Sequence, residues 1–367
     1  MGLIRKKIVI VFNNLNIGGI ETKIVDICNF YSKQNDYQIY LLLKSRTGQL
    51  LKSLPKNIIV ISPQSKSFLK IKTIIFPFWL AKQFREIKAN LIISFGNYSS
   101  ISSVLGRIFS FSKSKIIISD DSGLEKQIKK ETFSVIRKEL IKITYPMADE
   151  IILLTETGRN NLTELIPKDE SKIAVKKNWL PLSFKKTEFK QKRDIDILFL
   201  ARFEPQKNPL KFLKIIKKIK EKNNKIKVYM VGFGSLKSEI ESFIKNNNLT
   251  KNVLVKEATV TPKEYYQRVK LLILTSDYEG FPLTILEAFS QECIPVCNKI
   301  PEICDFFEKY PEDILYNNIN EAVNKILSLL DDQEKMKKIC LYYQKKIFLE
   351  QKVNFNKTID EFEKYCK

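Results

Sequence analysis

Short apolar runs alternate with longer amphipathic stretches along most of the chain. Residues 271–274 (LLIL) place four large apolar side chains in a row, a pattern typical of a strand buried on both faces of a parallel sheet. Residues 283–289 (LTILEAF) then space their apolar positions as a packed helix does. Because such runs and helical stretches keep alternating, we expect an α/β fold with doubly wound parallel sheets. The predicted strands are residues 7–12, 38–43, 57–61, 91–95, 115–119, 150–154, 173–175, 195–200, 227–231, 252–255, 271–274 and 294–297.

The alternation runs in two series, which predicts two domains. The first series ends near Pro181, and the stretch 183–193 that follows is charged and irregular, as linkers often are. We therefore predict two Rossmann-like domains that face each other across a cleft. The predicted boundaries are 1–180 for the first domain, 181–193 for the linker, 194–348 for the second domain, and 349–367 for a C-terminal helix that packs back on the first domain.

Residues 68–84 mix aromatic, aliphatic and basic side chains around Pro77, and they allow two interpretations. One is the ordinary core packing of a helix. The other is a basic, aromatic surface that touches a lipid bilayer.

The charge balance also allows two interpretations. The chain has 367 residues, of which 63 are Lys or Arg and 41 are Asp or Glu, so its formal net charge is +22. This excess reflects either the Lys-, Ile- and Asn-rich composition that an AT-rich genome produces or an attraction to anionic membrane surfaces and polyanions. We find no nucleic-acid-binding motif of the usual kinds, so we expect no specific nucleic-acid partner.

The sequence predicts a cytoplasmic protein, peripheral on the inner face of the plasma membrane if its charge serves attachment. The first apolar run is too short for a signal peptide, and no segment has the length of a membrane span. The six cysteines lack the spacing of a disulfide framework. Cys293, Cys297 and Cys304 suit buried thiols better than a metal site, so we expect no bound metal.

The chain contains no histidine. This excludes Ser-His-Asp and Cys-His catalysis, histidine-ligated zinc and a histidine general base. Any catalysis must rest on carboxylates, cations, hydroxyls and backbone dipoles.

The stretch 271–289 has the layout of a ligand site. Polar residues lead from the apolar run to Glu279, followed by Gly280, which permits backbone conformations that other residues avoid, and by Pro282 at the predicted helix start. Open α/β sheets bind ligands at the carboxyl ends of their strands, and a helix N-terminus offers N–H groups to an anion. We place Glu279 at the tip of this loop and Glu287 two turns into the helix.

Two cations are expected at the same sheet edge. Arg202 and Lys207 follow the predicted strand 195–200 and can neutralise the two phosphates of a nucleoside diphosphate. The N–H groups around Leu283 and Thr284 can add the dipole of the helix.

The carboxylates suit the other parts of such a ligand. Glu287 can accept hydrogen bonds from a ribose diol, and Glu279 can reach a sugar. Glycines after predicted strands let the backbone approach a ligand closely. The remaining residues expected to line the donor site are Gly280, Phe281, Gly232, Gly234, Gly18 and Gly19.

These motifs resemble the retaining, GT-B-fold glycosyltransferases called family 4, or glycosyl transferases group 1. With 41 acidic residues in the chain, the E-x7-E spacing of Glu279 and Glu287 says little alone, but the strand before it, the Gly-Phe-Pro within it and the helix after it make it specific. The matching segments are ARFEPQKNP, VGFGSLKSEIE and SDYEGFPLTILEAFSQECIPV in the second half, and GGIET and ADEIILLTETGRNNL in the first.

The resemblance implies an activity. Members of this family transfer a sugar from a nucleoside diphosphate donor to an acceptor with retention at the anomeric carbon. They need no metal or other cofactor, and the departing phosphate assists as base. For this chain it implies a saccharide or lipid-linked acceptor in cell-surface polysaccharide or glycolipid synthesis, with the first domain on the acceptor side and the nucleotide sugar bound by the second.

One position departs from the family pattern. Where members often carry a histidine that contacts the donor sugar, this chain has Ser119-Asp120-Asp121-Ser122. Asp120 or Asp121 either replaces the histidine, with Asp120 then counted as catalytic, or serves the loop. The main alternative function is a non-catalytic homologue that binds nucleotide sugar as a scaffold or regulatory subunit. The alternative of a polyanion-binding protein rests on the net charge alone. A GT-B-fold epimerase is a further alternative, and the intact Glu279 and Glu287 pair argues against it.

Overall fold

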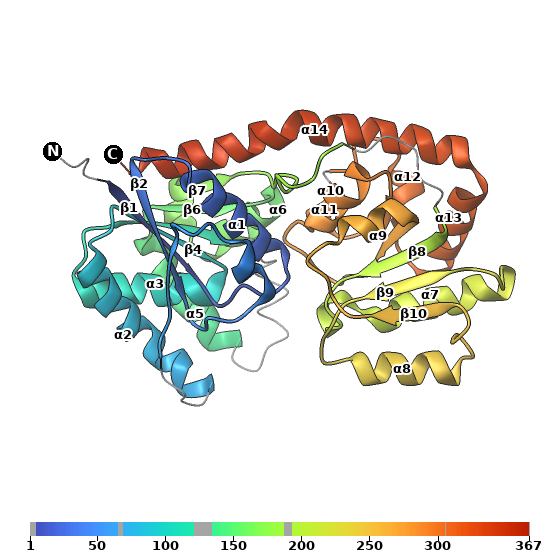
Figure 1. Cartoon of the computed structure of the whole chain (residues 1–367), viewed down its shortest axis with the longest axis horizontal. Helices are drawn as coiled ribbons and strands as arrows, with labels where there is room; N and C mark the ends of the chain where they lie inside the picture. Colours follow the sequence, from blue (N-terminus) through green and yellow to red (C-terminus); the bar gives the residue numbers. More distant parts are fainter. Residues whose placement is uncertain (1–4, 65–68, 121–133, 187–192, 305, 367) are drawn as a thin grey trace. The chain divides into compact units, whose positions relative to one another are not determined.

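The computed structural model describes residues 5–64, 69–120, 134–186, 193–304 and 306–366 (Figure 1). The chain divides into two compact units, one formed by Met1–Asn178 with Val353–Lys367 and the other by Trp179–Lys352. Each unit is built on its own sheet.

The first unit contains a seven-stranded sheet in the order β3-β2-β1-β4-β5-β6-β7, and all neighbouring strands are parallel. Its strands are β1 (Lys6–Phe12), β2 (Tyr37–Leu43), β3 (Ile59–Ile61), β4 (Leu91–Phe95), β5 (Lys115–Asp120), β6 (Glu150–Leu153) and β7 (Ile173–Val175). Its helices are α1 (Gly19–Tyr31), α2 (Leu69–Ile87), α3 (Asn97–Ser110), α5 (Ser134–Thr144) and α6 (Glu156–Leu165).

The second unit contains a six-stranded, fully parallel sheet in the order β10-β9-β8-β11-β12-β13. Its strands are β8 (Ile195–Leu200), β9 (Val228–Val231), β10 (Val253–Lys256), β11 (Val269–Leu274), β12 (Ile294–Asn298) and β13 (Leu315–Tyr316). Its helices are α7 (Pro209–Lys222), α8 (Lys237–Asn246), α9 (Lys263–Arg268), α10 (Leu283–Ser290), α11 (Pro301–Cys304), α12 (Pro311–Ile314) and α13 (Ile319–Asp331).

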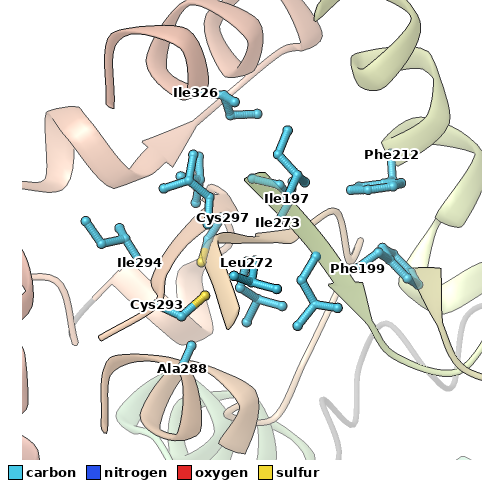
Figure 2. Packing of buried hydrophobic residues seen from close by; sticks show 14 of the residues in the cluster. Ile197, Phe199, Phe212, Leu272, Ile273, Ala288, Cys293, Ile294, Cys297 and Ile326 are labelled. Carbon is cyan, nitrogen blue, oxygen red and sulfur yellow. The ribbon is translucent and has the colours of Figure 1, made fainter. Parts of the chain in front are cut away.

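Both sheets confirm the predicted doubly wound α/β fold, and the uninterrupted apolar runs have a direct cause. Figure 2 shows Ala288 of α10 on one side of the central strands of the second unit and Ile326 of α13 on the other. Between them, Ile197 of β8, Leu272 of β11 and Ile294 of β12 are fully buried. A strand covered on both faces has no position that prefers a polar residue.

The last helix, α14 (Gln333–Lys364), contributes residues to both units. In the second unit its Tyr343 ring stacks on Phe289 of α10, with centroids 4.6 Å apart. In the first unit Phe355 meets Phe30 of α1 edge to face at 5.5 Å, and Glu361 pairs with Lys176 at 2.7 Å. Among the helices that the structure describes, none is long and apolar enough to cross a membrane.

Helix α2 has a buried face and an exposed apolar face. Phe76, Leu80 and Phe84 are buried in the core of the first unit, as ordinary packing requires. Ile74 and Phe78 point outward instead, with exposed fractions of 72% and 58%.

The contact between α2 and α3 depends on Gly106. A Cβ atom at this position would lie 2.9 Å from Leu80 Cβ and 3.1 Å from the carbonyl oxygen of Pro77. Both atoms are fixed by the backbone of α2, so neither can move aside as the end of a flexible side chain would.

We expect the Gly106→Ala substitution to destabilise the first unit by about 1–3 kcal/mol through overpacking. The higher helix propensity of alanine opposes this effect by about 1 kcal/mol. The midpoint of thermal unfolding, followed by circular dichroism, should therefore fall. Gly158→Ala on α6 is the matched control, because its Cβ would find Thr155 Oγ1 no closer than 3.3 Å. A midpoint for Gly106→Ala equal to or above that of the control would contradict the close-packing role.

Candidate active site

The carboxyl ends of β8 and β11 form a topological switch point in the second unit. The two strands are neighbours, although β9 and β10 lie between them in sequence, so the chain leaves them toward opposite edges of the sheet. Open α/β sheets bind ligands at such points. The pairing of Leu272 with Leu198 brings both strand ends to the same level. The loops that follow carry Arg202 and Lys207 after β8 and Glu279 after β11.

Lys207 and Glu279 form a nearly buried ion pair at this edge. Lys207 ends a short 3-10 turn, Pro205–Lys207, and its ammonium nitrogen lies 2.5 Å from Glu279 Oε1. The two side chains are only 17% and 8% exposed. The sequence places Glu279 in a loop but does not indicate that its side chain is largely buried. Its carboxylate turns inward because a cation meets it there, and a close contact is what offsets the desolvation of both charges.

Gln206 joins the second cation to this pair. Arg202 is exposed, and its Nη2 donates a hydrogen bond to Gln206 Oε1 at 3.3 Å. Gln206 Nε2 in turn donates to the carbonyl oxygen of Tyr278 at 3.1 Å. The amide N–H of Asp277 donates to the carbonyl oxygen of Gln206 at 3.0 Å. One side chain thus holds Arg202 beside the loop that carries Glu279.

Two further polar residues fasten the turn that carries Lys207. The buried Thr275 hydroxyl donates to the carbonyl oxygens of Lys207 at 2.8 Å and Asn208 at 3.0 Å. Asn208 adopts the left-handed conformation (φ 49°), and its Nδ2 donates to Asp277 Oδ1 at 3.1 Å. Sequence reasoning missed the roles of Gln206, Asn208, Thr275 and Asp277. The polar character of both loops was the only signal, and it does not say which side chains meet.

The glycines after β9 serve the packing of two loops. A Cβ atom at Gly232 would lie 2.0 Å from the carbonyl oxygen of Ala201, and one at Gly234 would lie 2.4 Å from that of Phe203. Gly234 also has a φ of +153°, which side chains rarely allow. These contacts account for both glycines structurally, and their part in donor binding stays a prediction.

Helix α10 begins shortly after Glu279 in the sequence. The helix begins at Leu283, so Leu283 and Thr284 lie in its first turn, where backbone N–H groups lack helical partners. The Phe281 ring packs on Phe306, with centroids 5.3 Å apart.

Glu287 is a buried acid on α10. It is the fifth residue of α10 and so lies about one turn into the helix, not two as the sequence suggested. Burial raises the pKa of Glu287 to about 7, and the hydrogen bond from Tyr266 opposes that rise. The Tyr266 hydroxyl on α9 donates to Glu287 Oε2 at 2.9 Å. Glu287 therefore exchanges its proton near neutral pH.

The predicted site residues of the first unit lie at strand ends of its own sheet. Gly18 precedes α1 in an extended conformation, and Gly19 is the first residue of that helix. Asp120 ends β5, is buried, and accepts a hydrogen bond from the Tyr145 hydroxyl at 2.5 Å. This contact gives Asp120 a structural role. Its catalytic role stays a prediction, and Asp121 lies outside the described residues.

Comparisons with known proteins agree with this architecture. The profile of the family described as "Glycosyl transferases group 1" matches residues 183–346, which include the whole Arg202–Glu287 constellation. The chain is 26% identical over 288 residues to the GalNAc-α-(1→4)-GalNAc-α-(1→3)-diNAcBac-PP-undecaprenol α-1,4-N-acetyl-D-galactosaminyltransferase of Campylobacter jejuni, covering 77% of this chain and 76% of that protein.

A second relative is matched over a shorter part. The chain is 28% identical over 185 residues to the poly(ribitol-phosphate) α-N-acetylglucosaminyltransferase of Staphylococcus aureus, which covers 50% of this chain and only 37% of that protein. Among solved structures, a mutant of S. aureus TarM in complex with fondaparinux, α-GlcNAc-glycerol and UDP superposes with a TM-score of 0.79 at 15% identity, covering 97% of this chain and 99% of the other.

The two parallel α/β sheets, the matched family profile and these homologues lead to one assignment. Residues 183–346 match the glycosyl transferases group 1 family, and the chain has two parallel α/β sheets as in the GT-B glycosyltransferases to which it is similar.

Proposed function

We propose that this glycosyltransferase moves a sugar from a nucleoside diphosphate donor to a saccharide or lipid-linked acceptor, with retention at the anomeric carbon and without a metal. The observation that carries the proposal is the Lys207–Glu279 contact of 2.5 Å at the switch point of the second sheet. It brings a cation for the departing phosphate and a carboxylate for the sugar into one place.

The charges suit a diphosphate. Arg202, Lys207 and Glu279 together leave one net positive charge when the donor is absent. A diphosphate gains negative charge as the sugar leaves, so both cations stabilise the transition state more than the ground state. The N–H groups in the first turn of α10 act in the same direction. Glu279 is then available to accept hydrogen bonds from the hydroxyls of the sugar.

Glu287 fits the nucleoside. Its carboxyl group can accept from a ribose diol through the oxygen that does not hold the Tyr266 hydroxyl, and Tyr266 fixes the orientation of the group. The names of the relatives support an acceptor in cell-surface polysaccharide or glycolipid synthesis, since one of them acts on an undecaprenol-linked saccharide and another on poly(ribitol-phosphate). Such an acceptor places the reaction in the cytoplasm, at the inner face of the plasma membrane.

A non-catalytic homologue is the second candidate. The observation in its favour is Asp120, because its carboxylate is held by Tyr145 and the chain has no histidine to take its place. This alternative predicts that nucleotide sugar binds without transfer or hydrolysis.

Two measurements on the same protein separate these functions. UDP is the first ligand to test, because the TarM structure contains it, followed by GDP, ADP and their common sugar conjugates. A nucleotide bound only by the native state must raise the melting temperature. Release of the nucleoside diphosphate from the matching sugar conjugate, with an acceptor or water, supports the enzyme. A thermal shift without any release supports the scaffold.

We expect Glu279→Gln and Lys207→Ala each to lower turnover by at least about a hundredfold, the loss typical of removing a transition-state charge partner. The matched control is Lys237→Ala, which breaks an exposed ion pair of the same length, 2.5 Å to Glu257, on the same unit. Its turnover should stay unchanged. Near-native turnover in both site variants would contradict the assignment of Lys207 and Glu279 to the active site. Because Lys207→Ala leaves Glu279 without its cation, a Lys207→Ala/Glu279→Gln double variant separates lost stability from lost catalysis.

Gln206→Ala should lower kcat/KM by about tenfold, since Arg202 would lose the partner that holds it beside the Glu279 loop. Most of the loss should lie in kcat if Arg202 acts on the leaving phosphate. Gln267→Ala is the control, because Gln267 also bridges two elements of this unit, donating to Gln291 Oε1 at 3.0 Å. Equal kinetics for the Gln206 variant and the control would show that Arg202 needs no such support.

Nucleotide affinity should rise with pH through about pH 7, where Glu287 loses its proton, because the carboxylate is the stronger hydrogen-bond acceptor. The gain is at most about tenfold, and Glu287→Gln should show only the titration of the nucleotide itself. Calorimetric titration with UDP between pH 6 and 8, a range on either side of the Glu287 pKa of about 7, measures the affinities of the unchanged chain and of Glu287→Gln. Identical pH profiles would exclude Glu287 from the ribose site.

The raised pKa of Glu287 also predicts a pH dependence of stability, which can be measured without a ligand. The native state keeps the Glu287 proton up to about pH 7, whereas the unfolded chain loses it near the ordinary value of 4.5. The free energy of unfolding should therefore decrease as pH rises through this window, and it should do so less in Glu287→Gln.

A further inference from the structure

The exposed apolar side chains of the protein are concentrated on one set of helices. Of the 16 large apolar side chains that are exposed in the described part of the chain, nine belong to α2, α3, α5 or the residues directly after them. These nine are Ile74, Ile75, Phe78, Ile108, Phe111, Val135, Ile136, Ile143 and Met147. Of the other seven, three lie on α14 and four are spread over the remainder of both units. A grouping of this kind marks an interaction surface more often than scattered single residues do.

The three helices lie next to one another on the first unit (Figure 1). Helix α3 packs between α2 and α5, and the inward side chains of all three share one core cluster with the sheet. On the outside, the Phe78 ring of α2 stacks on Phe109 of α3 with centroids 4.9 Å apart. Arg85 Nη2 donates to the carbonyl oxygen of Phe109 at 2.5 Å. Phe111, the residue just after α3, is 89% exposed. The outer faces of α2 and of the end of α3 therefore form one apolar surface.

Cations accompany this surface. The segments 74–88, 107–115 and 135–147 contain nine Lys or Arg residues and two Glu residues. Each of the two acids pairs with a lysine of its own helix, Glu86 with Lys82 at 3.8 Å and Glu139 with Lys142 at 2.8 Å. Among the remaining cations Lys88, Lys113 and Lys138 are exposed. Asp149, two residues beyond the last segment, pairs with both Arg107 at 2.9 Å and Lys115 at 2.8 Å. With Asp149 counted, nine cations stand against three acids, so the apolar residues still adjoin an excess of positive charge.

We propose that the outer face of α2, α3 and α5 docks the protein on an anionic phospholipid surface. Isoleucine, valine and phenylalanine side chains enter the boundary between headgroups and acyl chains, while the flanking lysines and arginines meet lipid phosphates. A second copy of the chain is a poorer occupant, because a symmetric contact would bring two sets of like charges together. This docking requires neither the ion pair of the second unit nor bound nucleotide, so it stands independently of the proposed reaction.

The docking is tested by co-sedimentation of the full chain with vesicles, without nucleotide. Phosphatidylcholine vesicles are compared with vesicles of phosphatidylcholine and phosphatidylglycerol. Binding should require phosphatidylglycerol and should weaken as salt rises. An Ile74→Ser/Phe78→Ser/Phe111→Ser variant should lower the partition coefficient by at least about tenfold. A Lys113→Gln/Lys138→Gln variant should lower it by about fivefold for each cation.

Two matched controls sit on the second unit. Leu254→Ser/Leu341→Ser/Leu349→Ser removes side chains that are 48%, 52% and 65% exposed, and Lys214→Gln/Lys217→Gln removes the same charge as the basic variant. Both controls should bind vesicles as the unchanged chain does, and all variants should keep its melting temperature. Absence of binding to anionic vesicles, equal loss in the control variants, or an oligomer that only the Ile74/Phe78/Phe111 variant dissociates would overturn the proposal.

Discussion

The nearly buried ion pair between Lys207 and Glu279 is the contact on which the arrangement of the site depends. It joins two loops that are 72 residues apart in sequence and that meet only because β8 and β11 are neighbours in the sheet. Two charges removed from water are stable only with close, well-formed contacts, so the pair tolerates little displacement of either loop. The hydrogen bonds of Thr275 to the Lys207 carbonyl and of Gln206 to the Tyr278 carbonyl hold the two loops in position. The chemistry of the site therefore rests on the register of two parallel strands.

The sequence was sufficient to predict that sheet and to predict which residues lie at its carboxyl edge. The run 271–274 has no polar interruption because helices cover both faces of the sheet, and polar residues follow it where the strand ends. It was not sufficient for contacts inside the loops. Glu279 stands in a polar stretch that does not indicate its burial, and only the cation facing it explains why it turns inward. The strand Leu315–Tyr316 was missed because two residues form no recognisable run.

Helix α2 shows a similar limit to what sequence patterns can predict. A mixed stretch such as 68–84 is compatible with a core helix and with a membrane-facing helix. Helix α2 has a buried face with Phe76 and an exposed apolar face with Phe78, two residues further along. Helical periodicity predicts that the faces differ, but it does not say which face the sheet covers. That assignment comes from neighbours distant in sequence, here Gly106 and the ring of Phe109 on α3.

Each charged or titratable group at the proposed donor site already has a partner within its own unit. Lys207 holds Glu279, Arg202 holds Gln206, and Glu287 holds the Tyr266 hydroxyl. An incoming donor must therefore exchange or extend existing interactions, and its net affinity is the difference between the two sets. The same partners keep the cations and the carboxylates in place without a ligand. In the proposed reaction this would leave little reorganisation for the moment when charge develops on the phosphate, and the site would favour the transition state over the ground state, the difference on which turnover depends.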